Sequence, residues 1–119
     1  MLKSDVVVPY LYEISKMFGK EWTLRVILEL RRVNTIRYND LLESLEGIST
    51  STLSTTLKNL QKSGLIKRRS SGKNPPFKVE YSLTERGFGF VMALYPLLKW
   101  VVKKQSMPKY LIKNTIIKN

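Results

Sequence analysis

The hydrophobic period of the chain changes at Gly64, and this change constrains the fold more than any other feature. Before it, in GISTSTLSTTLKNLQKSG, Leu53, Leu57 and Leu60 recur at the spacing of one helix face. After it, LIKRR and FKVEYSL alternate apolar and polar residues as strands do, and SSGKNPP between them is typical of a turn. The pattern predicts a helix followed by a two-stranded hairpin.

The predicted helix, which Ser49 caps and Gly64 follows, has an unusual composition. Seven of the eight residues from 49 to 56 carry a hydroxyl group, and residues 47–66 contain no acid. Ser and Thr are poor helix formers, so an ordinary solvated face would favour Glu, Lys and Ala. A helix in the DNA major groove instead needs short donors and acceptors, and an acid there would repel phosphates. The composition favours a helix that reads DNA.

Other helices are expected on both sides of this unit. The first begins at Pro9 and ends at Gly19, and two more span residues 21–32 and 38–45. Thr84 caps a last helix that reaches about residue 104 and that Pro96 should kink. Together these elements predict a mainly α (α+β) winged helix-turn-helix over residues 1–105. Residues 106–119 form a basic and apolar tail whose conformation the sequence leaves open.

The positive charge of the chain is confined to one part of the sequence. Residues 1–46 carry seven acids and seven bases, so the whole formal charge of +12 lies after Glu46. Only two acids, Glu80 and Glu85, occur there. A one-sided basic field is typical of a protein that binds a polyanion.

Composition also excludes several function classes. The sequence has no Cys and no His, which excludes zinc fingers, disulfides and Cys-His or Ser-His-Asp catalysis. Asp40 and Glu43, one turn apart, are more typical of a solvated pair than of a catalytic one. We therefore expect no enzyme activity, no catalytic residue, no cofactor and no metal.

The longest apolar run, residues 88–98, falls short of the roughly 20 residues that cross a bilayer, and no signal peptide is apparent. We expect no membrane partner and a cytoplasmic, nucleoid-associated protein.

Residues 9–102 resemble the HxlR family of bacterial and archaeal transcription regulators, which is close to the MarR group. The resemblance is carried by GKEWTLRVILEL, IRYNDLLESLEGISTSTLSTTLKNLQKSGLIKR and PFKVEYSLTERG. It implies a homodimeric regulator of double-stranded DNA, with one recognition helix per subunit in successive major grooves. Many family members carry a Cys-Pro pair where this chain has Val8 and Pro9, so thiol sensing is excluded here.

These arguments give two sets of candidate residues. For DNA binding, we expect base or water-mediated readout by Ser51, Thr52, Thr55 and Asn59, with Ser49 at the helix start and Thr56 reaching phosphate. Phosphate contacts are expected from Lys58, Lys62, Arg68, Arg69, Lys73, Arg37 and Asn39. The resemblance implies pairing through the first and last helices, for which the candidates are Tyr10, Leu11, Ile14, Phe88, Val91, Met92, Tyr95, Leu98 and Val102.

Alternatives remain open at this point. A sequence-tolerant architectural DNA protein is the main one, and a protein-interaction module or an RNA-binding protein are others. A small-molecule effector is also left open. It would lie between the dimer helices near Trp22, Tyr95 or Trp100, although such residues are more often core.

Overall fold

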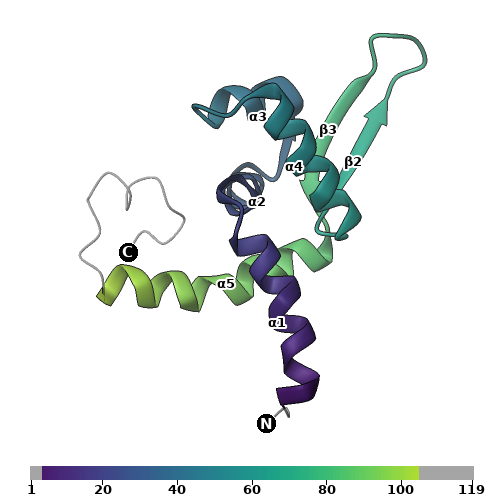
Figure 1. Cartoon of the computed structure of the whole chain (residues 1–119). Coiled ribbons are helices and arrows are strands. Elements are labelled where there is room, and N and C mark those ends of the chain that lie inside the picture. The colour runs from purple at the N-terminus through teal and green to yellow at the C-terminus, as the bar shows by residue number, and fades with distance from the viewer. Residues whose placement is uncertain (1–3, 105–119) are drawn as a thin grey trace.

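The computed structural model describes residues 4–104 as five helices and a small sheet (Figure 1). In chain order the elements are α1 (Ser4–Phe18), α2 (Glu21–Val33), β1 (Thr35–Arg37), α3 (Tyr38–Ser44), α4 (Thr50–Lys62), β2 (Ile66–Ser71), β3 (Lys78–Leu83) and α5 (Glu85–Lys104). The hairpin of β2 and β3 projects from the helices as a wing at the end of the molecule that carries α3 and α4. Helices α1 and α5 extend from the other end. This is a winged helix-turn-helix, as the sequence predicts.

The core lies where α2 and α4 meet the sheet and α5. Val26, Ile27 and Leu30 of α2 pack in one cluster with the predicted stripe of α4. Val91 of α5 is in the same cluster and is fully buried. Burying one such side chain contributes about 1.5–3 kcal/mol, so the stripe fixes which face of α4 is left exposed.

The predicted two-stranded hairpin is confirmed by β2 and β3, and β1, which the sequence did not predict, adds a third antiparallel strand in the order β1-β3-β2. In β1, Arg37 pairs with Glu80 of β3, and Glu80 also pairs with Arg69 of β2. The strand β1 has only three residues. Such a segment becomes a strand through its partner and carries no periodic signal of its own.

Two predicted boundaries differ from the structure. Helix α1 begins at Ser4, so the prediction that Pro9 opens it was wrong. Pro9 is the sixth residue of α1, and the helix continues through it although proline cannot donate the backbone hydrogen bond of that turn. The wing strands extend to Ser71 and start again at Lys78, which makes the tip shorter than the seven residues predicted. The predicted tail, residues 106–119, lies outside the described residues.

The end of α4 is joined to the start of α5 by a small polar junction. Gly64, at φ 74°, lets the chain turn out of α4. The Thr84 hydroxyl donates to the Gly64 carbonyl oxygen at 2.6 Å and accepts from the Gly87 backbone N–H at 3.0 Å. These bonds fix the orientation of α5 relative to α4. Among residues 4–104, every helix lacks the length and apolar character that crossing a membrane requires.

Candidate nucleic-acid interface

The N-terminus of α4 is capped by its own hydroxyl residues. Ser49 has extended backbone angles, and its Oγ accepts a hydrogen bond from the Thr52 backbone N–H at 3.0 Å. The same Oγ donates to the Thr52 hydroxyl oxygen at 2.9 Å. The predicted cap is confirmed. Because they bond to each other, these two hydroxyl groups are less free to bind DNA than their neighbours.

The rest of the outer face of α4 is exposed and uncharged near its start, then cationic. Its exposed residues are Ser51, Ser54, Thr55, Lys58, Asn59 and Lys62. They lie opposite Leu53, Leu57 and Leu60, which are buried. This face therefore presents short hydroxyl and amide groups, which can hydrogen-bond to base edges, and two lysines, which can neutralise phosphates.

Thr56 does not belong to this face. Its side chain is only 8% exposed and lies on the buried side of the helix. In this conformation it cannot reach a phosphate, and that expectation is corrected. Ser54, which the sequence argument did not select, is exposed and joins the outer face.

Tyr38 ties α4 to the preceding helix. Its hydroxyl donates to the Thr50 carbonyl oxygen at 3.0 Å and lies 3.0 Å from the Ser54 hydroxyl oxygen. Beside Tyr38, the exposed Arg37 and Asn39 line a shallow cavity of about 370 Å³ with Phe77 of the wing. Arg37 and Asn39 thus lie between the start of α4 and the wing, as the expected contact with the DNA backbone would require.

The wing carries exposed cations without acidic partners. Arg68 and Arg69 on β2 and Lys73 at the tip are exposed. All three ion pairs found in residues 4–104 lie within α1 or α2, so no cation of α4 or the wing is paired. Glu80 is the one acid on the wing strands, and the backbone register of the sheet places it opposite Arg37 and Arg69. The net field of this end of the molecule is positive.

Large apolar side chains are exposed on α1 and α5. Of the candidate pairing residues, Tyr10, Leu11, Ile14, Phe88 and Met92 are exposed, and Tyr95, Leu98 and Val102 are partly buried. Val91 has no exposed surface and packs in the core of its own subunit, so its assignment to a pairing surface is corrected. Tyr12, Phe18, Leu97 and Trp100 are exposed as well, although sequence reasoning did not select them as pairing residues.

The effector cleft expected between two subunits stays a prediction, and within one subunit its three aromatic residues lie in different surroundings. Trp22 and Tyr95 pack against the core, whereas Trp100 is exposed. Neither of the two cavities described for residues 4–104 is lined by any of them.

Comparisons with known proteins agree with this geometry. A family model described as HxlR-like helix-turn-helix matches residues 17–109. The chain is 41% identical over 95 residues to an uncharacterised HTH-type transcriptional regulator, YdzF of Bacillus subtilis, covering 80% of this chain and 82% of YdzF. A possible HxlR family transcriptional factor from Thermoplasma volcanium has a similar structure, with a TM-score of 0.63 at 33% identity, covering 79% of this chain and 83% of that one. A putative MarR family regulator from Enterococcus faecalis gives a TM-score of 0.72 at 27% identity, covering 90% and 96%.

Proposed function

The chain belongs to the HxlR-like helix-turn-helix family of transcriptional regulators, and we propose that it acts as a homodimer on a pseudo-palindromic site in double-stranded DNA. Helix α4 enters the major groove, and the wing contacts the flanking backbone or the minor groove. One observation carries the proposal. The exposed, acid-free outer face of α4 lies at the same end of the molecule as the unpaired wing cations (Figure 1).

The outer face of α4 divides into reading and anchoring residues. Ser51, Thr55 and Asn59 are exposed and short, so they are assigned to base edges or to waters on them. Thr52 and Ser49 contribute mainly by holding the first turn of the helix. Phosphate contacts are assigned to Lys58, Lys62, Arg68, Arg69, Lys73, Arg37 and Asn39.

The apolar surface of α1 and α5 is assigned to pairing. Several large apolar side chains there are exposed in the isolated subunit, and such patches usually mark interaction sites. Helix α1 and the C-terminal part of α5 extend away from the wing (Figure 1), so two subunits joined there leave both α4 helices free. A two-fold pair of this kind reads half-sites about one helical turn apart.

A second candidate function, sequence-tolerant architectural binding, is favoured by one observation. Ser49 and Thr52 satisfy each other, which reduces the number of free reading groups on α4. Phosphate contacts alone would then supply most of the affinity.

A competition assay separates the two candidates. Genomic fragments that the protein retains at near-physiological salt are titrated against bulk DNA, and sedimentation reports the oligomeric state. A regulator should prefer its site by about a thousandfold or more, and it should sediment as a dimer. Equal affinity for all duplexes would favour the architectural function, and a monomer at working concentration would remove the dimer from the proposal.

A further inference from the structure

Phe77 is the one large apolar side chain that the wing, residues 66–83, exposes. Half of its surface is exposed, and it does not belong to the core cluster or to the residues packed against that cluster. A Cβ at Gly72 would lie 3.7 Å from Cδ1 of Phe77, so the ring lies against the tip of the wing. Residues 66–79 contain five cations and no acid. The wing therefore holds a bare aromatic ring within a cationic surface.

The ring of Phe77 also forms part of the wall of the cavity beside α3. This cavity, of about 370 Å³, is lined by Phe77 and Val79 of the wing and by the four residues where β1 joins α3, namely Arg37, Tyr38, Asn39 and Asp40. Its one cation and its one acid cancel, so the lining carries no net charge. The cavity is thus a neutral recess with an aromatic wall, which suits an uncharged and partly apolar group better than a phosphate.

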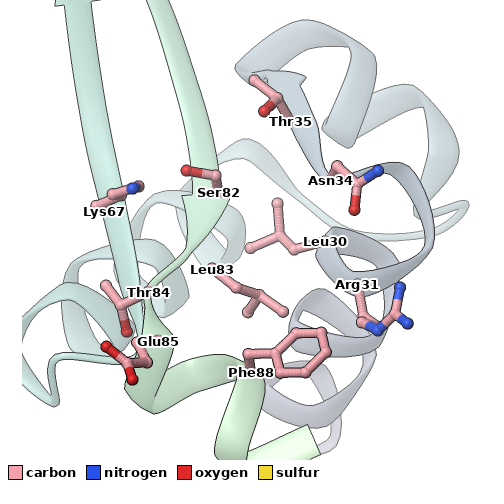
Figure 2. Close-up of a pocket in the computed structure, with 10 residues that line it drawn as sticks. All are labelled: Leu30, Arg31, Asn34, Thr35, Lys67, Ser82, Leu83, Thr84, Glu85 and Phe88. Carbon is pink, nitrogen blue, oxygen red and sulfur yellow. The ribbon is translucent and has the colours of Figure 1, made fainter.

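The other cavity of the described residues has an aromatic wall of a different kind. It has a volume of about 390 Å³ and lies where α2 meets the base of the wing and the start of α5 (Figure 2). One face of its Phe88 ring is taken by Arg31, whose guanidinium carbon lies 5.1 Å from the ring centre. Among residues 4–104, no cation lies over the ring of Phe77 in this way. The ring of Phe77 is therefore available to another molecule.

The cavity beside α3 lies where one DNA strand passes in the proposed complex. Its wall residue Tyr38 bonds to Thr50 at the start of α4, and its opposite wall is the wing. When α4 lies in a major groove and the wing lies at the flanking minor groove, the strand that separates these grooves runs between α4 and the wing. That strand alternates charged phosphates with uncharged sugars. Arg37 and Asn39 are assigned to a phosphate, so the neighbouring sugar comes to the neutral cavity.

We propose that Phe77 packs against C2′ of one deoxyribose in each half-site and thereby makes the protein selective for DNA over RNA. Deoxyribose carries a CH₂ group at C2′, whereas ribose carries a hydroxyl group there. Against the ring of Phe77 and the side chain of Val79, that hydroxyl group would be buried without a hydrogen-bond partner, which is unfavourable. The inference rests on the proposed DNA function, and it adds to the wing a contact that reads the sugar.

Single ribonucleotides within a DNA duplex test this contact, because each adds one hydroxyl group and leaves the bases and the phosphates unchanged. The probe is the genomic duplex that the full chain retains most tightly, with one ribonucleotide placed at each position of both strands in turn. Fluorescence anisotropy gives each affinity. One position in each half-site, beside the groove that α4 reads, should lose about tenfold in affinity, which is the cost of burying an unpaired hydroxyl group. Other positions should change little.

Three wing variants separate the sugar contact from charge. Phe77→Leu keeps an apolar side chain and should keep the discrimination between ribose and deoxyribose. Phe77→Asn should abolish it, because the amide can hydrogen-bond to the added hydroxyl group. Lys78→Gln is the neighbouring control, since Lys78 does not line the cavity, and it should leave the ratio of the two affinities unchanged. Phe77 lies outside the core, so its variants should fold, and thermal unfolding verifies this.

The affinity for the all-DNA duplex, measured on the same samples, separates this inference from the proposed function. A protein that binds no duplex would lose both the regulator and the sugar contact. Tight DNA binding without a sensitive position, or with one that persists in Phe77→Asn, would remove the sugar contact and uphold DNA binding. Equal loss of discrimination in Phe77→Leu and Phe77→Asn would also overturn the inference, because leucine keeps the apolar surface that the contact needs.

Discussion

The Tyr38 hydroxyl donates a hydrogen bond to the Thr50 carbonyl oxygen at 3.0 Å, which joins the first residue of α3 to the first residue of α4. The same hydroxyl lies 3.0 Å from the Ser54 hydroxyl oxygen. This contact sets the angle at which α4 leaves the body of the protein. It therefore supports the helix that we propose enters the groove, without itself being a reading residue.

Replacing Tyr38 by Phe should loosen α4 while keeping the fold. Each lost hydrogen bond lowers the free energy of unfolding by about 0.5–1.5 kcal/mol, and duplex affinity should fall a few-fold. Tyr12→Phe is the control, because it removes a hydroxyl from an exposed tyrosine of α1. Urea unfolding and fluorescence anisotropy measure the two effects. Equal stability and affinity in both variants would show that the contact is unimportant.

Two glycines of α5 should respond oppositely to alanine. A Cβ at Gly87 would lie 1.9 Å from the Leu65 carbonyl oxygen, whereas nothing lies within 4 Å of one at Gly89. Gly87→Ala should destabilise the protein by about 1–3 kcal/mol or more, because backbone must move. Gly89→Ala should stabilise it by about 0.5–1 kcal/mol, since alanine is the better helix former. Thermal unfolding gives both values, and a tolerated Gly87→Ala would contradict the packing at this junction.

Adjacent threonines in α4 test the reading face. Valine has nearly the shape of threonine, so each substitution removes little more than the hydroxyl group. Because Thr55 is exposed, Thr55→Val should change the free-energy difference between duplexes that differ at one base pair of the site by about 1–3 kcal/mol. Thr56→Val should alter neither preference nor affinity, because Thr56 is buried. The reverse result, measured by competition among single-base variants of a bound duplex, would place the reading face on the other side of the helix.

The cations of the wing should act through charge alone. Replacing Arg69 and Lys73 by Ala should weaken binding to all duplexes and reduce the slope of log affinity against log salt by about 0.9 per lost phosphate contact. Replacing Lys20 and Lys99 by Ala removes the same charge outside α4 and the wing and should leave the slope nearly unchanged. Identical slopes for the two double variants would remove the wing from the interface.

The sequence predicts α4 well because its limits are local. Ser49 caps it through a neighbour three residues away, and Gly64 ends it through its own backbone angle. The burial of Thr56, which we had assigned to phosphate, could also have been predicted from the sequence. Thr56 lies about 60° from the buried Leu53 on a helical wheel. The burial of Val91 could not have been predicted, because α5 is apolar on several sides and its hydrophobic period does not separate core residues from surface residues.

Features that depend on distant partners could not be predicted. The three residues of β1 form a strand only through their pairing with residues 80–82 of β3. The cavity at Arg31 forms where α2 meets the wing base and the start of α5, which lie some 50 residues later in the sequence (about 33 to 82). No spacing rule connects such positions.

The most direct test of the account is selection of bound duplexes from a random pool at near-physiological salt, by the wild type and by Asn59→Ala. Asn59 is exposed on α4 and is assigned to base readout. We predict that the wild type recovers an inverted repeat with half-sites about one helical turn apart, and that the variant loses preference at the same position in both halves. Tight, salt-sensitive binding without any recovered motif would contradict sequence reading by α4 and would make the protein an architectural one.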